Sequence, residues 1–316
     1  MLVQGKWVEN WQPVQATDAK GGFVRQTSSF RNWVTPDGDA GPTGAAGFPA
    51  EVGRYHLYVA LTCPWASRTL IARMLKRLDD VIDVSVVEPE LSDQGWRFSA
   101  GDALTGATHL HELYTRADVS FTGRATVPVL WDKATGTIVN NESADIVRMF
   151  NSGFGALADD TIDLYPEAHG PDIDAWNARI YPALNNGVYR AGFATTQVAY
   201  EEAFHGVFAM LDTVEEHLQT HGFLSGGVLT EADIRLFVTL VRFDAAYYGL
   251  FKCNKRRISD YPAVTAYLVR MLDVPGIRET VSIDHIKRGY FSIKALNPNG
   301  IIPLGPEWNL DRLPQP

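Results

Sequence analysis

The segment around Cys63 constrains the fold more than any other part of this sequence. Residues 54–61 are rich in aromatic and branched side chains, which is typical of a β-strand. Pro64 follows Cys63 and opens a helical pattern, and proline is tolerated at the first helical position because its missing N–H would have no partner there. The pattern therefore predicts that Cys63 stands at the N-terminus of a helix, just after a strand.

A cysteine in this position is a candidate nucleophile. The free N–H groups and the dipole of a helix N-terminus favour the thiolate, which is the reactive form. A buried structural cysteine is the alternative. The third residue after Cys63 is Ala66, so a Cys-x-x-Cys pair is absent and an external thiol must release any mixed disulfide on Cys63. Glutathione, the abundant cytosolic thiol, is the expected co-substrate.

Composition narrows the class of protein. The 316 residues are long enough for two domains, and 46% hydrophobic and 21% charged residues are ordinary for a globular protein. The formal charge of −9 argues against a broad nucleic-acid surface. We find neither an apolar run long enough to span a membrane nor a secretory signal. The chain has two cysteines, which favours a reducing, cytoplasmic setting, and a Cys63–Cys253 disulfide is the less favoured alternative.

Residues 54–151 have the order of elements of a thioredoxin-like domain. A strand, a helix and a strand come first, which implies that the two strands are parallel. Two strands joined by a turn then lead into another helix. Residues 88–123, between these halves, are polar and unassigned, and long loops of this kind are often functional. The expected strands are 54–61, 82–87, 126–131 and 137–140, and the expected helices are 65–78 and 142–150.

The rest of the chain divides by composition. We expect the scattered aromatic side chains of the N-terminal extension to pack onto the body, and Pro36–Pro49 has the Gly/Pro/Ala content of a loop. Thr230 is expected to cap a helix, with Asp233 at the capping-box position. The expected segments are the extension 1–53, the first domain 54–151, a linker 152–170, a helical domain 171–296 with helices at 173–184, 197–219, 231–250 and 263–272, and an irregular tail 297–316.

Two further motifs suit the binding of a peptide-like ligand. Pro128 follows Val127 in a predicted strand, where it is either an ordinary edge-strand proline or part of a cis bond that exposes the Val127 backbone for pairing. Ser143 stands near the start of the next helix, where simple capping is the alternative to holding a carboxylate while Glu142 meets an ammonium group. The γ-glutamyl end of glutathione carries both charges.

The helical half holds polar side chains with less specific signals. Tyr189, Tyr247, Tyr248 and Tyr290 are candidates for chemistry, although core packing explains any one of them. The basic run from Lys252 to Arg257 is expected to be a solvated loop between helices.

These motifs resemble a known family. Cys63-Pro64-Trp65-Ala66, Thr126 to Asp132 and Asn141-Glu142-Ser143 resemble the N-terminal domain of glutathione transferases. More specific phrases of the second half resemble the Xi class, the glutathionyl-hydroquinone reductases, and the resemblance spans about residues 1–306. Those phrases are Asn185 to Tyr189, Gly192 to Ala194, Leu229 to Arg235, Arg242 to Asp244, Phe251 to Cys253 and Asp284 to Lys287.

The resemblance implies a thioredoxin-like α/β domain followed by an all-α domain, the glutathione transferase fold. It implies glutathione-dependent reduction of S-glutathionyl-hydroquinones, with Cys63 as nucleophile, Tyr189 as general acid/base, and Tyr247 and Tyr290 in support. A bound metal ion is not expected. The protein is expected to be a homodimer and to lie in the cytoplasm. The residues implied to bind glutathione are Trp96, Arg124, Ala125, Thr126, Val127, Glu142 and Ser143.

Two alternatives remain open at this point. Another cysteine-type transferase activity, such as thiol transfer, dehydroascorbate reduction or β-etherase-like cleavage, would share Cys63 and differ in its tyrosine pocket. A non-catalytic binding module would keep the fold without the chemistry, since fold alone does not decide function.

Overall fold

The computed structural model describes residues 1–9 and 16–307, which form two compact units. The first unit contains residues 1–9 and 26–163, and the second contains residues 16–25 and 164–307. The N-terminal extension is therefore divided: residues 16–25 pack with the helical unit, whereas the rest of its described part belongs to the first unit.

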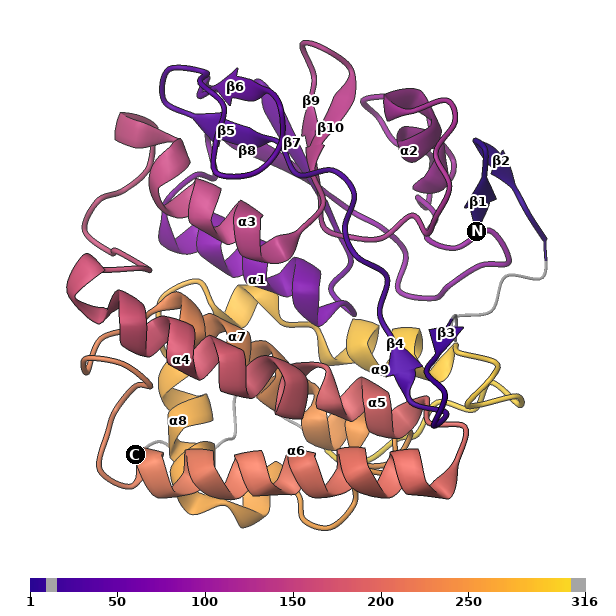
Figure 1. Cartoon of the computed structure of the whole chain (residues 1–316), viewed down its shortest axis with the longest axis vertical. Helices are drawn as coiled ribbons and strands as arrows, with labels where there is room; N and C mark the ends of the chain where they lie inside the picture. The colour runs from indigo at the N-terminus through magenta and orange to yellow at the C-terminus, as the bar shows by residue number, and fades with distance from the viewer. Residues whose placement is uncertain (10–15, 308–316) are drawn as a thin grey trace. The chain divides into compact units, whose positions relative to one another are not determined.

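A four-stranded sheet forms the centre of the first unit, in the order β10-β9-β7-β8. Strands β7 and β8 run parallel, and β9 and β10 run antiparallel to their neighbours. All five residues of β7 are buried, as expected for an inner strand. Helices α1 and α3 pack together on one face of the sheet (Figure 1). The bounds are β7 Tyr55–Val59, β8 Ile82–Val86, β9 Val129–Asp132, β10 Thr137–Asn140, α1 Pro64–Leu75 and α3 Ser143–Arg148.

The sheet and its helices confirm the predicted thioredoxin-like order, with shifted ends. Helix α1 ends at Leu75 rather than at residue 78, because Arg77 takes a left-handed φ of 49° and the chain turns back toward β8. The predicted last helix is split, since α3 stops at Arg148 and a π-helical turn, Met149–Gly153, follows it. The unassigned stretch 88–123 contains a short helix, α2 (His111–Ala117), which packs near β10.

The Gly/Pro/Ala-rich stretch is not a loop throughout. Its last residues, Gly47–Pro49, form β6, which pairs in parallel with β5 (Trp33–Thr35). A side chain at position 47 would meet the Asp39 carbonyl oxygen at 1.9 Å, so glycine is the residue that lets the chain come this close. Short hairpins precede these strands: β1 (Leu2–Val3) with β2 (Lys6–Trp7) in the first unit, and β3 (Ala16–Thr17) with β4 (Phe23–Val24) in the second.

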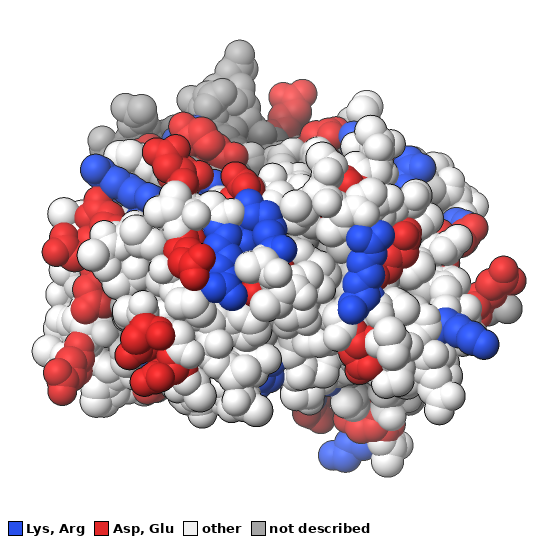
Figure 2. Space-filling model, turned by 90° about the horizontal axis from the view of Figure 1, so that it is seen from above, with Lys and Arg blue, Asp and Glu red and all other residues white. Residues whose placement is uncertain are grey.

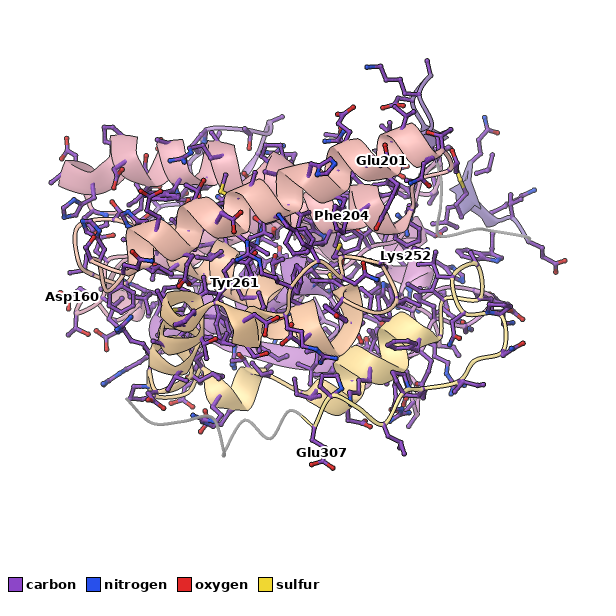
Figure 3. The ribbon with its side chains drawn as sticks, turned by 90° about the horizontal axis from the view of Figure 1, so that it is seen from below. Asp160, Glu201, Phe204, Lys252, Tyr261 and Glu307 are labelled. Carbon is purple, nitrogen blue, oxygen red and sulfur yellow. The ribbon has the colours of Figure 1, made fainter. Side chains whose placement is uncertain are left out.

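The second unit is helical. Every residue of α7 except Arg235 is buried, so α7 is its central helix. The long helix α6 carries the exposed Glu201 and also Phe204, whose ring packs on the buried Phe208 (Figure 3). The helices are α4 Gly170–Ile180, α5 Gly187–Gly192, α6 Gln197–Leu218, α7 Glu231–Arg242, α8 Pro262–Leu272 and α9 Ile283–Phe291.

The sequence predicts four of these helices and misses α5 and α9. Predicted helices 197–219 and 263–272 are confirmed as α6 and α8 within one residue at each end. The helices predicted at 173–184 and 231–250 each consist of an α-helix continued by a π-helical turn, Tyr181–Asn185 and Phe243–Tyr247. Thr230 is confirmed as the N-cap of α7, and the Asp233 carboxylate accepts hydrogen bonds from its N–H (2.9 Å) and its hydroxyl (3.0 Å).

Lys and Arg side chains described on the face in Figure 2 are interspersed with Asp and Glu rather than gathered in one basic area. The basic run from Lys252 is a loop, as predicted, with exposed Lys252 and Lys255. Among the described helices, none combines the length and the hydropathy that a membrane span requires. The described part of the tail, residues 297–307, contains neither helix nor strand, and residues 308–316 lie outside the described chain.

Candidate active site

Cys63 stands at the N-terminus of α1, as the sequence predicts. It is the N-cap residue with extended backbone angles (φ −82°, ψ 120°), and Pro64 occupies the first helical position. Its thiol is partly exposed and lies 3.6 Å from the Val127 carbonyl oxygen, to which it donates. Both cysteines are thiols rather than halves of a disulfide. The sulfur of Cys63 therefore combines access with the position that favours a thiolate.

The peptide bond between Val127 and Pro128 is cis, which confirms the second interpretation of this motif. The Val127 side chain is buried, and its N–H group has no hydrogen-bond partner within the described residues. A backbone N–H beside an accessible sulfur suits pairing with an extended peptide.

Tyr114 holds the segment that leads into this bond. Its buried hydroxyl donates to the Thr126 carbonyl oxygen at 2.7 Å and accepts from the Thr126 N–H at 3.2 Å. The Asn141 side-chain amide also donates to it, at 3.1 Å. Tyr114 thus ties Thr126 to the residue just before Glu142, so the two predicted glutathione-binding segments are linked through one hydroxyl. Sequence patterns do not indicate this role, because Tyr114 lies in the polar stretch 88–123, which has no clear helical or strand period.

At the start of α3, the structure excludes simple capping by Ser143. Glu142 rather than Ser143 is the N-cap residue, and its carboxylate accepts from the Ala144 N–H at 3.2 Å and from the Ser28 hydroxyl at 2.9 Å. Ser143 is buried, and its hydroxyl has no hydrogen-bond partner within the described chain. A buried hydroxyl at a helix N-terminus is well suited to an added carboxylate, which such termini attract.

A small pocket of about 60 Å³ gathers most of the other predicted glutathione-binding residues. Trp96 and residues 124–126 line it, so the structure brings together positions about thirty apart in the sequence. Trp7, from the N-terminal hairpin, also lines it, and its ring stacks on His111 with 4.7 Å between ring centroids. Sequence reasoning missed Trp7, although its place among the scattered aromatics of the extension indicated that it packs somewhere.

Three of the four singled-out tyrosines form a cluster within the second unit. The Tyr290 hydroxyl lies 2.5 Å from that of Tyr189 and 2.8 Å from that of Tyr247. They come from α9, α5 and the π-helical turn after α7, respectively. Burial raises the pKa of both Tyr247 and Tyr290 well above the usual value, so both remain protonated donors, whereas Tyr189 is partly exposed.

Tyr248 and Cys253 fall outside this cluster. Instead, the Arg257 guanidinium lies over the Tyr248 ring, with its central carbon 4.6 Å from the ring centroid. Cys253 is fully buried, and burial raises the pKa of its thiol to about 12. No group of His, Cys, Asp and Glu side chains suited to a metal ion occurs within residues 1–9 and 16–307.

Comparison with known proteins points to one family. The chain matches the models "Glutathione S-transferase, N-terminal domain" over residues 62–152 and "Glutathione S-transferase, C-terminal domain" over residues 197–270. It is 52% identical to glutathionyl-hydroquinone reductase YqjG of Escherichia coli (strain K12), over 98% of this chain and 96% of the relative. It is 46% identical to glutathionyl-hydroquinone reductase PcpF of Sphingobium chlorophenolicum, over 97% and 96%.

Solved structures give the same result. The glutathione-bound structure of YqjG aligns with a TM-score of 0.87 and 54% identity, covering 90% of this chain and 94% of that one. The Xi glutathione S-transferase of Phanerochaete chrysosporium aligns with a TM-score of 0.89 and 47% identity, covering 95% and 97%.

Proposed function

This chain belongs to the Xi class of glutathione transferases, the glutathionyl-hydroquinone reductases, and we propose that it reduces S-glutathionyl-hydroquinones through a mixed disulfide on Cys63. The observation that carries the proposal is the partly exposed Cys63 sulfur at the N-terminus of α1, without a second cysteine in the three residues after it. Such a thiolate can take one glutathionyl group but needs a second glutathione for its release.

We assign glutathione to the first unit. The Val127 N–H would pair with its cysteinyl backbone, and Trp96 with residues 124–126 would line the tripeptide. The Ser143 hydroxyl and the N-terminus of α3 would hold the γ-glutamyl carboxylate, while the Glu142 carboxylate would meet the ammonium group. Each group matches the charge or the hydrogen bond that glutathione presents.

The chemistry at the ring explains why phenols are needed. In the substrate the glutathione sulfur is bonded to an aromatic carbon, and an aryl carbanion is a poor leaving group. If the ring first takes its keto form, the carbon leaves as an enolate. Tyr189 would exchange protons with the ring oxygen or carbon, and Tyr290 and Tyr247 would donate hydrogen bonds behind it.

The bonds and electrons then balance over two steps. The sulfur-bearing ring carbon gains its proton when the ring takes the keto form. The Cys63 thiolate then attacks the glutathionyl sulfur, the carbon–sulfur bond breaks, and its electron pair restores the aromatic ring as a phenolate, whose oxygen takes a proton. The products are hydroquinone and the Cys63–glutathione disulfide. A second glutathione thiolate attacks that disulfide, which releases oxidised glutathione and restores the Cys63 thiolate. The proton of the second thiol balances the proton gained by the ring.

Two substitutions test the proposal. Cys63→Ala should abolish both reductase turnover and simple disulfide exchange, whereas Tyr189→Phe should lose the reductase activity and keep the exchange. Parental reductase turnover in Cys63→Ala would refute the covalent scheme. Parental reductase turnover in Tyr189→Phe would favour another cysteine-type transferase mechanism.

We further infer that the protein acts as a homodimer in the cytoplasm. The two cysteine thiols suit a reducing compartment, and symmetric pairs are the commonest protein oligomers. Light scattering on the full chain would give the mass of the particle, and a monomer at micromolar concentration would contradict the dimer.

A further inference from the structure

The guanidinium group of Arg25 lies over the ring of Tyr189. Its central carbon is 4.8 Å from the centroid of that ring, and its Nε donates to the Asn186 side-chain oxygen at 3.0 Å. Asn186 is the N-cap residue of α5, three residues before Tyr189. The cation and the phenol are therefore fixed to the start of the same helix.

The segment that carries Arg25 is anchored along its length to the second unit. The Thr195 N–H donates to the Gly21 carbonyl at 3.0 Å, and the Thr196 hydroxyl donates to the Lys20 carbonyl at 2.6 Å. The buried ring of Phe23 packs against Phe193, with 5.5 Å between centroids. Because these contacts hold the segment in place, the Arg25 guanidinium has a defined position.

Ionisable groups face Tyr189 from several elements. Arg25, in the segment after β4, lies over the Tyr189 ring. The hydroxyls of Tyr290, from α9, and Tyr247, from the π-helical turn, cluster with the Tyr189 hydroxyl. The buried Arg242, at the end of α7, adds positive charge behind Tyr247 and Tyr290. Because burial keeps the latter two phenols protonated, any negative charge in the cluster belongs on Tyr189.

We propose that Arg25 stabilises the phenolate form of Tyr189 and thereby sets the pH at which this tyrosine accepts a proton from the substrate. A cation over an aromatic face is attracted to it even when the ring is neutral, and far more when the ring carries a negative charge. Arg25 is thus a positioning residue supplied by the N-terminal extension. The inference rests on the proposed function, in which Tyr189 exchanges protons with the hydroquinone ring.

The direct test is a titration of tyrosinate absorbance on the full chain without any substrate. Tyr189→Phe identifies the signal of Tyr189 by its disappearance. In Arg25→Gln we expect this signal to move to higher pH by about one unit, and in Arg25→Lys by less, because the charge remains while the planar fork is lost. The pH profile of kcat should move in parallel, and KM for glutathione should stay unchanged.

Arg179→Gln is the matched control, since its exposed guanidinium also lies 4.8 Å from an aromatic centroid, that of Trp176. It should change neither titration nor pH profile. The inference would be overturned if the Tyr189 signal in Arg25→Gln stayed at the parental pH. It would also be overturned if Tyr189 in the parent protein did not titrate at a lower pH than the other tyrosines. Full reductase activity of Tyr189→Phe would instead overturn the proposed role of that phenol and leave the titration result standing.

Discussion

The hydroxyl of Tyr189 lies 2.5 Å from the hydroxyl of Tyr290. Tyr290 contacts Tyr247 in the same way, at 2.8 Å, so its hydroxyl joins the other two phenols in one cluster. A hydroxyl donates one hydrogen bond, and therefore Tyr290 can donate to only one of these two neighbours and accepts from the other. A proton taken up or given off at Tyr189 thus changes the hydrogen bonds of all three.

Removing the Tyr290 hydroxyl should slow the ring chemistry. In Tyr290→Phe, we expect kcat for glutathionyl-hydroquinone to fall about a hundredfold, the lower range of general acid/base effects. Simple disulfide exchange at Cys63 should remain near the parental rate, because it requires no proton transfer to a ring. Steady-state kinetics with both substrates measure the two activities.

Tyr248→Phe is the control for this substitution, since Tyr248 packs against Arg257 and lies outside the cluster. It should leave both activities at parental values. Equal losses of both activities in Tyr290→Phe would contradict the account and indicate a general effect on folding.

Ser143→Ala should separate ligand binding from stability. The helix cap is made by Glu142, and the Ser143 hydroxyl has no partner in the described chain, so the midpoint of thermal unfolding should be unchanged or slightly higher. The affinity for glutathione, measured by calorimetry, should fall about tenfold through the loss of one charge-assisted hydrogen bond.

The exposed Ser152, in the π-helical turn after α3, offers the same chemical change outside the proposed site. Ser152→Ala should leave glutathione affinity unaltered. If Ser143→Ala binds glutathione as tightly as the parent, the carboxylate is held elsewhere.

Trp7→Ala should weaken glutathione binding without affecting the chemistry. The indole stacks on His111 and lines the pocket that Trp96 and Arg124 also line. Loss of this wall should raise KM for glutathione about fivefold, a modest loss of apolar contact. Trp7→Phe should restore most of the affinity, and transfer of the glutathionyl group to Cys63 in a single turnover should proceed at the parental rate in both variants. An unchanged KM would show that the hairpin does not contribute to the site.

Cys253 should be inert in the native protein. Burial raises the pKa of its thiol to about 12, so its thiolate is scarce at pH 8 and increases only as the pH approaches that value. A thiol reagent at pH 8 should therefore modify one group per chain, Cys63, and reach the second only after denaturation. Two rapidly modified groups in the native protein would contradict this assignment.

Most of the thioredoxin-like part could be predicted from sequence because local signals mark it. A segment rich in aromatic and branched residues specifies β7, and Pro64 marks the start of α1. The ends of the elements were less predictable. Helix α1 stops near Arg77, which takes a left-handed conformation, and an arginine in the sequence does not indicate that conformation. Helices α5 and α9 are short, at six and nine residues, and too few positions show the helical period.

The candidate site could be predicted where its motifs are contiguous in sequence. The position of Cys63 was predicted and is confirmed, and of the two interpretations of Pro128 the structure shows the cis bond. Tyr114 and Trp7 could not be found in this way, because their roles arise from contacts with residues far along the chain. Simple capping by Ser143 was the alternative interpretation at α3 and is wrong, because the Glu142 carboxylate caps this helix from one residue earlier.

Intact-mass spectrometry gives the most direct test of the covalent intermediate. The full chain would be mixed with glutathionyl-hydroquinone in the absence of free glutathione, with Cys63→Ser as the control. We predict that the parent gains the mass of one glutathionyl group, releases one equivalent of hydroquinone and loses the added mass when glutathione is supplied. Release of hydroquinone without any gain in mass, or the same gain in Cys63→Ser, would contradict a mixed disulfide on Cys63.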